Sequence, residues 1–305
     1  MIQIIKYKKY AFIFSGILTI ASLVAILVFG LKPGIDFTGG SLLEVSFTGS
    51  RPTAAEVRGS LAELNLGNII AQPLDDDGMI VKTRFISEDE HQMILTSLRN
   101  SFSKDGNQVL ENRIETIGPA ISSNLKDRAV ASVVAVSICI VLYIAYTFRK
   151  VSRPMNSWQY GVAAIVALLH DILITVGVFA VLGRYMGVEV DVPFVVALLT
   201  ILGYSINDTI IVFDRIRENL AIEGSDNFPK TVNSGLNQTI ARSLNTSGTT
   251  LITLFALYLF GGATIHYFAL ALIIGVAFGT YSSVFVASAL LVAWYEWREK
   301  RRARE

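Results

Sequence analysis

The sequence predicts an α-helical polytopic membrane protein with one small α+β domain outside the membrane, and three observations support this. Hydrophobic residues make up 52% of the 305 residues and charged residues only 17%, whereas an ordinary soluble domain has about 25% charged residues. The apolar residues gather in long runs, which are typical of membrane-spanning helices. One long polar stretch, residues 32–128, separates the first run from the others. The net charge of +1 gives no sign of nucleic acid as a partner.

Six apolar runs are each long enough to cross the membrane, because a helix needs about 20 residues to span about 30 Å of hydrocarbon. They cover residues 10–31, 129–148, 159–182, 191–213, 240–261 and 266–294. The first run is longer than the apolar core of a signal peptide, and no small-x-small cleavage site precedes Lys32. We therefore expect the first run to remain in the protein as a helix.

Basic residues flank alternate ends of these runs, and lysine and arginine near span ends stay in the cytoplasm. They are Lys6, Lys8, Lys9, Arg149, Lys150, Arg153, Arg215, Arg217, Lys230, Arg298, Lys300, Arg301, Arg302 and Arg304. The opposite loops offer only Arg184. We expect cytoplasmic termini, with the N-terminus and first span in residues 1–31, a five-span bundle in residues 129–297 and a basic tail in residues 298–305.

The polar residues 32–128 predict one compact α+β domain on the extracytoplasmic side. The segments SLLEVSFTG, NIIAQPL, MIVKTRF and QVLENRIETIG are expected to be strands, and TAAEVRGSLAEL and SEDEHQMILTSLRNSF read as capped helices. This βαββαβ order fits a ferredoxin-like fold. His91 has no companion ligands, which favours an ordinary surface histidine over a metal site. We expect neither a metal nor a catalytic residue here.

Three of the predicted spans carry polar side chains on one face. Asp208 shares a helical face with Tyr204 and Ser205, and His170 and Asp171 fall about halfway along the third span. The fifth span has a polar stripe at helical spacing, formed by Arg242, Asn245, Thr246, Thr249, Thr250 and Thr253. An ionisable group in hydrocarbon costs about 2.5 to 3.5 kcal/mol, so these groups should face protein or water. Their types are those of proton relays.

Depth in the membrane places Asp208 near Arg242. Asp208 lies about 9 Å from the inner end of its span, and Arg242 lies about one turn into the next span. We expect the two side chains to form a coupled pair. Two plainer alternatives stay open. In the first, Arg242 is an interfacial anchor and Asp208 is a buried structural acceptor. In the second, His170 and Asp171 form a satisfied core pair, because adjacent side chains point about 100° apart and cannot both line one narrow path.

Small residues mark two further positions. Gly275, Gly279 and Ser283 lie on one ridge of the sixth span, a pattern that favours close helix packing over a ligand site. Gly34, Gly39 and Gly40 flank Asp36 just after the first span, where glycine permits a hinge or a tight packing turn. We expect Asp36 to be a cap or turn acceptor.

Four motifs resemble a known family. They are GIDFTGG at residues 34–40, LLHD at residues 168–171, GYSINDTIIVFDRIREN at residues 203–219 and ARSLNTSGTTLITL at residues 241–254. They closely resemble motifs of the SecF branch of the SecD/SecF family, which belongs to the bacterial Sec protein-export machinery. The resemblance implies half of an RND-type transporter, in the bacterial cytoplasmic (inner) membrane. It also implies that the protein acts together with SecD beside the SecYEG channel. There the two subunits use the proton motive force to draw preproteins outward.

The family's proton-pathway carboxylate corresponds to Asp208 in this sequence, and its essential arginine corresponds to Arg242. The resemblance therefore implies no cofactor other than protons as the coupling ion, and a partner with six further spans. Two rivals remain: an RND-like exporter of lipids or small molecules, and an intramembrane aspartyl protease built on Asp171 and Asp208. No Walker motif occurs in the sequence, so we expect no direct use of ATP.

Overall fold

The computed structural model describes residues 1–104, 106–147, 154–224 and 227–304. The chain divides into a helical unit, residues 1–32 with 131–305, and an α+β unit, residues 33–130. The predicted cytoplasmic residues Arg149, Lys150 and Arg153 lie outside the described residues, as does residue 305 at the end of the basic tail.

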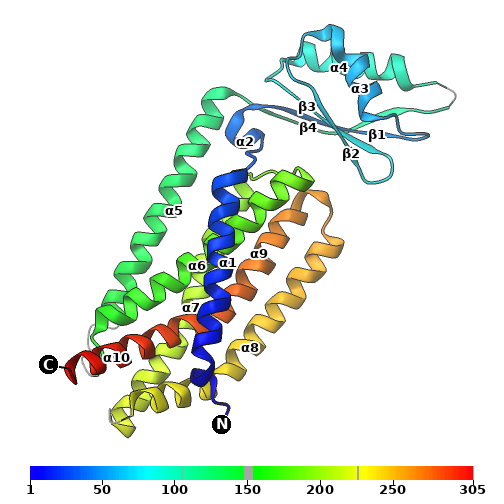
Figure 1. Cartoon of the computed structure of the whole chain (residues 1–305). Helices are drawn as coiled ribbons and strands as arrows, with labels where there is room; N and C mark the ends of the chain where they lie inside the picture. The colour runs from blue at the N-terminus through cyan, green and yellow to red at the C-terminus, as the bar shows by residue number, and fades with distance from the viewer. Residues whose placement is uncertain (105, 148–153, 225–226, 305) are drawn as a thin grey trace. The chain divides into compact units, whose positions relative to one another are not determined.

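The helical unit is built from long helices that lie side by side (Figure 1). They are α1 (Lys8–Phe29), α6 (Ser157–Met186), α7 (Val192–Glu223), α8 (Phe228–Phe260), α9 (Ala263–Ser282) and α10 (Ser288–Arg302). The short 3₁₀-helix η1 (Ile4–Tyr7) precedes α1, and the π-helix η3 (Ser283–Ala287) joins α9 to α10. Helix α5 (Pro119–Thr147) begins in the α+β unit and continues into the helical unit. Local sequence sets where these helices begin. Asp191, for example, accepts a hydrogen bond from the Phe194 N–H, and proline follows in the first turn of α7.

Five stretches of the described residues are long and apolar enough to cross a membrane. They are Ile4–Phe29, Pro119–Thr147, Ser157–Met186, Val192–Ile222 and Ile265–Arg302. The fifth predicted span, residues 240–261, lies in α8, which is 33 residues long but is not among these five. The polar stripe of α8 explains this difference, because its threonines, Asn245 and Arg242 lower the hydropathy of the helix.

Close helix packing in this unit depends on glycine. A side chain at Gly177 of α6 would place its first carbon 2.4 Å from Ser22 of α1. At Gly275 of α9 the same atom would meet Ile201 of α7 at 2.2 Å, and at Gly279 it would meet Ser205 at 3.0 Å. These helices therefore approach each other more closely than any larger residue permits.

Replacing Gly275 by leucine is expected to separate α9 from α7. Overpacking a close contact costs typically about 1 to 3 kcal/mol. The variant Gly275→Leu should therefore unfold at a lower temperature in detergent than the unchanged protein. Gly16→Leu is the matched control, because a side chain at Gly16 of α1 would meet nothing within 4 Å. Equal melting temperatures for the two variants would show that the α7 to α9 contact yields without cost.

The α+β unit contains the six predicted elements in the predicted order. After the short helix α2 (Ile35–Thr38) come β1 (Gly40–Phe47), α3 (Ala54–Leu61) with η2 (Ala62–Leu64), β2 (Ile70–Leu74), β3 (Gly78–Thr83), α4 (Glu88–Phe102) and β4 (Val109–Ile117). The strands form one antiparallel sheet in the order β2-β3-β1-β4. Alternating residues of β1, such as Val45 and Phe47, are buried with residues of the two helices, such as Val57 and Leu98.

His91 is buried, so our expectation of a surface histidine is wrong. Only 5% of the residue is exposed. Its Nδ1 lies 3.1 Å from a carboxylate oxygen of Glu88, and its Nε2 lies 3.1 Å from one of Glu111 on β4. The polar side of α4 here faces the edge strand β4, which helical periodicity alone does not reveal. No set of three or more potential ligands able to hold a metal occurs among the described residues.

Acid is expected to loosen the start of α4 through Glu90. The Arg84 guanidinium, together with the Ser87 N–H, lowers the pKa of Glu90 to about 2. Because this pKa is lower in the folded than in the unfolded chain, the stabilising contribution of Glu90 is present at neutral pH. It is lost as the pH falls from about 5 towards 2. Amide hydrogen exchange should show protection of the first turn of α4 falling over this range.

Glu90→Gln should lower that protection at neutral pH and flatten its dependence on pH. Asp89→Asn is the control, since Asp89 lies in the same turn and makes no hydrogen bond or ion pair within the described structure. A Glu90→Gln protein that keeps the pH dependence of the unchanged protein would show that other carboxylates cause it.

Candidate functional site

Two carboxylates are buried between the helices, Asp171 on α6 and Asp208 on α7. Asp171 has no exposed surface and Asp208 is 3% exposed. Both were predicted as proton-pathway residues. Their surroundings differ sharply, and this difference decides what each group can do.

Asp171 is fully supplied with hydrogen-bond donors. One carboxylate oxygen lies 2.9 Å from Nδ1 of His170, and the other accepts hydrogen bonds from Ser205 of α7 (2.6 Å) and Ser282 of α9 (2.7 Å). The neighbouring Thr175 hydroxyl donates to the Asp171 carbonyl. The carboxylate thus joins α6, α7 and α9, and each of its two oxygens has a hydrogen-bond partner.

His170 reaches Asp171 although adjacent helical positions point about 100° apart. Its ring lies near the rings of Phe278 and Tyr281 on α9. The Nε2 atom of His170 is buried and has no hydrogen-bond partner in the described part of the chain. His170 and Asp171 therefore contact each other through Nδ1, and the other ring nitrogen of His170, Nε2, is not used in this contact.

Asp208 has the opposite character, because its hydrogen bonding is incomplete. Ser243 of α8 is the polar side chain beside its carboxyl group. Among the described residues, Oδ2 of Asp208 and the hydroxyl of Ser243 are both buried without a hydrogen-bond partner. The next residue, Thr209, is satisfied by the Ser205 carbonyl and by the Ser283 hydroxyl at 2.8 Å. A buried carboxylate with an unfilled acceptor is suited to receive a proton.

Arg242 does not meet Asp208 within this chain. Arg242 is exposed, and no ion pair joins it to Asp208 in the residues that the structure describes. The physical reason is the rotation of α8: Ser243 takes the inward position, and its neighbour points about 100° away. The other predicted stripe residues Asn245, Thr246 and Thr249 are exposed on α8 as well. Tyr204, in contrast, points into the seam and its hydroxyl bonds to that of Ser247.

Sequence reasoning missed four hydroxyl residues, Ser243, Ser247, Thr280 and Ser282. Ser243 and Ser247 lie four residues apart on the buried face of α8, beside the stripe that we predicted. That spacing was a usable signal, since small residues at i and i+4 favour a helix contact.

The glycine motif after the first span forms a tight turn in the α+β unit. Gly39 and Gly40 have positive φ angles of 71° and 132°. A side chain at Gly40 would place its first carbon 2.7 Å from the Thr83 carbonyl oxygen, and one at Gly39 would lie 3.3 Å from the Ser122 hydroxyl. Gly34 precedes α2, and Asp36 lies in its first turn. Both glycines are thus needed where β1 begins beside β3.

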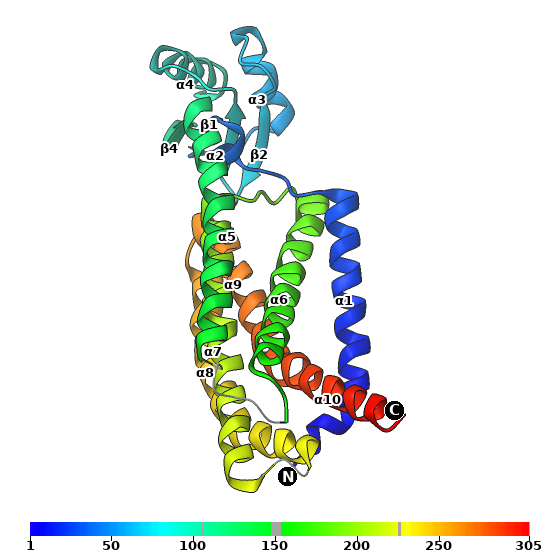
Figure 2. The ribbon, with the colours of Figure 1, turned by 90° about the vertical axis from the view of Figure 1, so that its left-hand side faces the viewer.

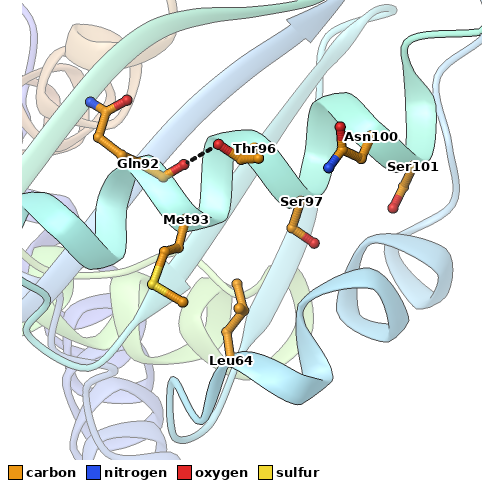
Figure 3. A pocket seen from close by; sticks show the side chains of 7 residues that line it. All are labelled: Leu64, Gln92, Met93, Thr96, Ser97, Asn100 and Ser101. Atoms are coloured by element: carbon orange, nitrogen blue, oxygen red, sulfur yellow. Dashed lines mark hydrogen bonds between the residues drawn. The ribbon is translucent and has the colours of Figure 1, made fainter.

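A shallow groove of about 440 Å³ lies between η2 and α4 in the α+β unit (Figure 3). It is lined by Leu64, Gln92, Met93, Thr96, Ser97, Asn100 and Ser101. None of these side chains is ionisable, so the groove offers no group for acid or base chemistry. The buried carboxylates Asp171 and Asp208 lie in the helical unit.

Comparison with known proteins identifies the family. Residues 97–297 match the family described as "Protein export membrane protein SecD/SecF, C-terminal", and residues 24–50 match the "SecD/SecF GG Motif". The second match covers the glycine turn, and the first covers both buried carboxylates.

Individual proteins agree with these matches. Protein translocase subunit SecF of Thermobaculum terrenum is 40% identical, over 96% of this chain and 94% of that protein. Protein translocase subunit SecF of Desulfurispirillum indicum is 38% identical, over 96% and 91%.

Larger relatives contain a region like this chain. Protein translocase subunit SecDF of Brucella abortus is 33% identical over 94% of this chain but only 37% of its own length. The crystal structure of SecDF from Thermus thermophilus, a translocon-associated membrane protein, superimposes with a TM-score of 0.81 and 33% identity. The superposition covers 96% of this chain and 38% of the longer SecDF chain. This chain therefore belongs to the SecD/SecF family of protein-export membrane proteins.

Proposed function

We propose that this chain is a SecF-type accessory subunit of the Sec translocase in which Asp208 carries protons through the membrane. The observation that carries this proposal is the buried, incompletely hydrogen-bonded carboxyl group of Asp208. A group in this state changes its interactions with each proton that it binds, and such a change is able to bias helix packing. Moving one charge through 100 mV is worth about 2.3 kcal/mol, which is enough to shift a two-state helix bundle.

The membrane half comprises six spans when α8 is included. Its 33 residues reach about 50 Å, which is more than a bilayer core requires. It packs against α7 and α9, and Figure 2 shows it beside both. A polar stripe exposed on such a helix is costly in lipid. We infer that the stripe, with Arg242, Asn245, Thr246 and Thr249, faces a partner protein.

That partner is a SecD-like protein with six further spans. The SecDF relatives hold a region like this chain within a much longer chain. Arg242 is adjacent in sequence to Ser243, so it lies at nearly the same depth as Asp208 and faces the partner. Together the two halves make the RND-type arrangement, and the partner's surface contacts the Arg242 side chain, which is exposed in this chain alone.

The two ends of the helical unit support an orientation in the bacterial inner membrane. The Lys8 ammonium pairs with the Glu296 carboxylate, so the start of α1 and the end of α10 lie together. Trp158, Trp294 and Trp297 gather beside Arg298 at this end, where they line a cavity of about 950 Å³. Tryptophan and arginine at one end of a bundle are typical of the membrane interface. We place both termini in the cytoplasm.

The α+β unit then lies outside the cytoplasm. Its strand order β2-β3-β1-β4 and its two helices support a ferredoxin-like fold. In this proposal the unit contacts the unfolded preprotein that leaves SecYEG, and its link through Gly39 and Gly40 is a packed turn. The chain's role is transport, with protons as the coupling ion and no other cofactor.

His170 and Asp171 serve the same pathway by positioning. Through Ser205 and Ser282 the Asp171 carboxylate fixes α7 and α9 one turn from Asp208. The same saturation argues against the protease alternative, which needs two carboxylates that share one water. Asp171 is occupied by three donors, and Asp208 faces Ser243 on another helix.

Co-purification and proton uptake test this function. The chain is co-expressed with a SecD protein and SecYEG, purified in mild detergent and reconstituted into vesicles under an imposed pH gradient. We expect both partners to co-purify and protons to enter only when the SecD protein is present. Purification without these partners, together with transport of a fluorescent lipid or small molecule, would favour the exporter alternative and refute the proposal.

A further inference from the structure

A line of hydroxyl groups occupies the buried seam between α7, α8 and α9. It begins one helical turn from Asp208 and runs away from the end of the unit that holds Lys8 and Glu296. Its members come from three helices: Tyr204 from α7, Ser247 and Thr250 from α8, and Thr280 from α9. This line differs from the exposed stripe of α8 that contains Arg242.

These hydroxyls form a continuous set of contacts. The Tyr204 hydroxyl lies 3.3 Å from that of Ser247 and 3.4 Å from that of Thr250. The Ser247 hydroxyl is bonded to that of Thr280, which also donates to the Val276 carbonyl. Burial increases along the line, because Thr250 and Tyr204 are partly exposed whereas Ser247 is 3% exposed. The line therefore leads from a more accessible end into the protein.

One turn further along α8 lies Ser243, about 6 Å from Ser247 along the helix axis. Here the contacts stop, and the described neighbours leave both the Ser243 hydroxyl and Oδ2 of Asp208 without a partner. Buried polar atoms of this kind are commonly satisfied by an ordered water. Ser243 is at the same time the side chain that lies beside the Asp208 carboxyl group, so it connects the helix that carries the hydroxyls to the buried carboxylate.

We propose that Thr250, Tyr204, Ser247 and Ser243 form the path by which protons reach Asp208, with water bridging the turn between the two serines. This inference rests on the proposed function of Asp208. At each step a hydroxyl oxygen accepts a proton from its outer neighbour and releases its own proton to the inner neighbour. The Asp208 carboxylate takes the last proton and becomes a neutral carboxylic acid. The hydroxyls are chemically unchanged and must turn back before the next proton.

Thr280 has a separate role as a positioning residue. Its hydroxyl is held by the Val276 carbonyl and in turn contacts Ser247. It therefore fixes the rotamer of Ser247 without lying on the path from Tyr204 to Ser243. Replacing it by valine, which has nearly the same shape, should slow proton uptake less than removal of the Ser247 hydroxyl.

The test measures proton uptake into vesicles that hold the chain with its SecD partner. The double variant Tyr204→Phe with Ser247→Ala should take up protons at least about tenfold more slowly than the unchanged protein. Ser247→Thr, which restores a hydroxyl at this position, should recover most of the rate. Thr200→Val is the matched control, because the Thr200 hydroxyl is exposed on α7 and bonds to its own helix at the Val196 carbonyl.

The outcomes separate this inference from the function on which it rests. If the double variant takes up protons normally while Asp208→Asn does not, the path is wrong and the role of Asp208 stands. If Asp208→Asn takes up protons normally, the proposed function itself fails. Co-purification with the SecD protein checks assembly of each variant. Should the double variant not assemble, the single variants Tyr204→Phe and Ser247→Ala decide, and normal uptake by both would overturn the path.

Discussion

An Asp208→Asn variant is expected to insert and assemble normally but to lose all proton-driven stimulation of export. Asparagine has nearly the same shape as aspartate, so the packing of α7 against α8 should survive. Its amide does not take up a proton at physiological pH, so the change of state that biases the helices no longer occurs. Export of a secreted preprotein should fall to the level measured without a proton gradient.

Two variants make this result specific. Asp214 lies on the same helix, but it is exposed and paired with Arg217. The Asp214→Asn variant should therefore export the preprotein normally. Arg242→Ala should lose export like Asp208→Asn, because the stripe of α8 would present no positive charge to the SecD partner. Normal proton-driven export by Asp208→Asn would remove the carrier role from this residue.

The α+β unit could be predicted element by element, because each of its signals is local. Alternating apolar residues mark β1 and β3, and two capping boxes, at Thr53 and Ser87, mark where α3 and α4 begin. Burial of His91 depends instead on which strand lies beside α4. The position of that strand is a property of the tertiary fold, and helical periodicity does not predict it.

In the helical unit the sequence revealed the carboxylates but not their neighbours. A carboxylate in an apolar run is conspicuous because burying its charge is costly, and both Asp171 and Asp208 were found for this reason. A serine or threonine in a membrane helix costs little and bonds to its own backbone, so Ser243, Ser247 and Ser282 gave a weak signal. The position of Arg242 was also not predicted, because depth along the helix does not reveal rotation about its axis, and the rotation of α8 turns Ser243 inward and leaves Arg242 exposed.

Asp171→Leu is expected to destabilise the helical unit more than any other single change considered. It leaves the Ser205 hydroxyl and the ring nitrogen of His170 buried with no acceptor, and it leaves the Ser282 hydroxyl with only the Gly279 carbonyl. Removal of one partner from a buried charged network costs about 3 to 5 kcal/mol. The melting temperature of the purified protein in detergent should fall clearly, and the yield of assembled complex with the SecD protein should fall with it.

A triple variant, Asp171→Leu with Ser205→Ala and Ser282→Ala, separates the packing role of this cluster from its role in export. Replacing a buried polar cluster by apolar groups of similar volume is often neutral for stability. The triple variant should therefore regain much of the lost melting temperature. Its export should stay low if Asp171 positions α7 and α9 for the proton step at Asp208. Recovery of both stability and export would show that the cluster only holds the helices together, and His170 and Asp171 would then have no part in the pathway.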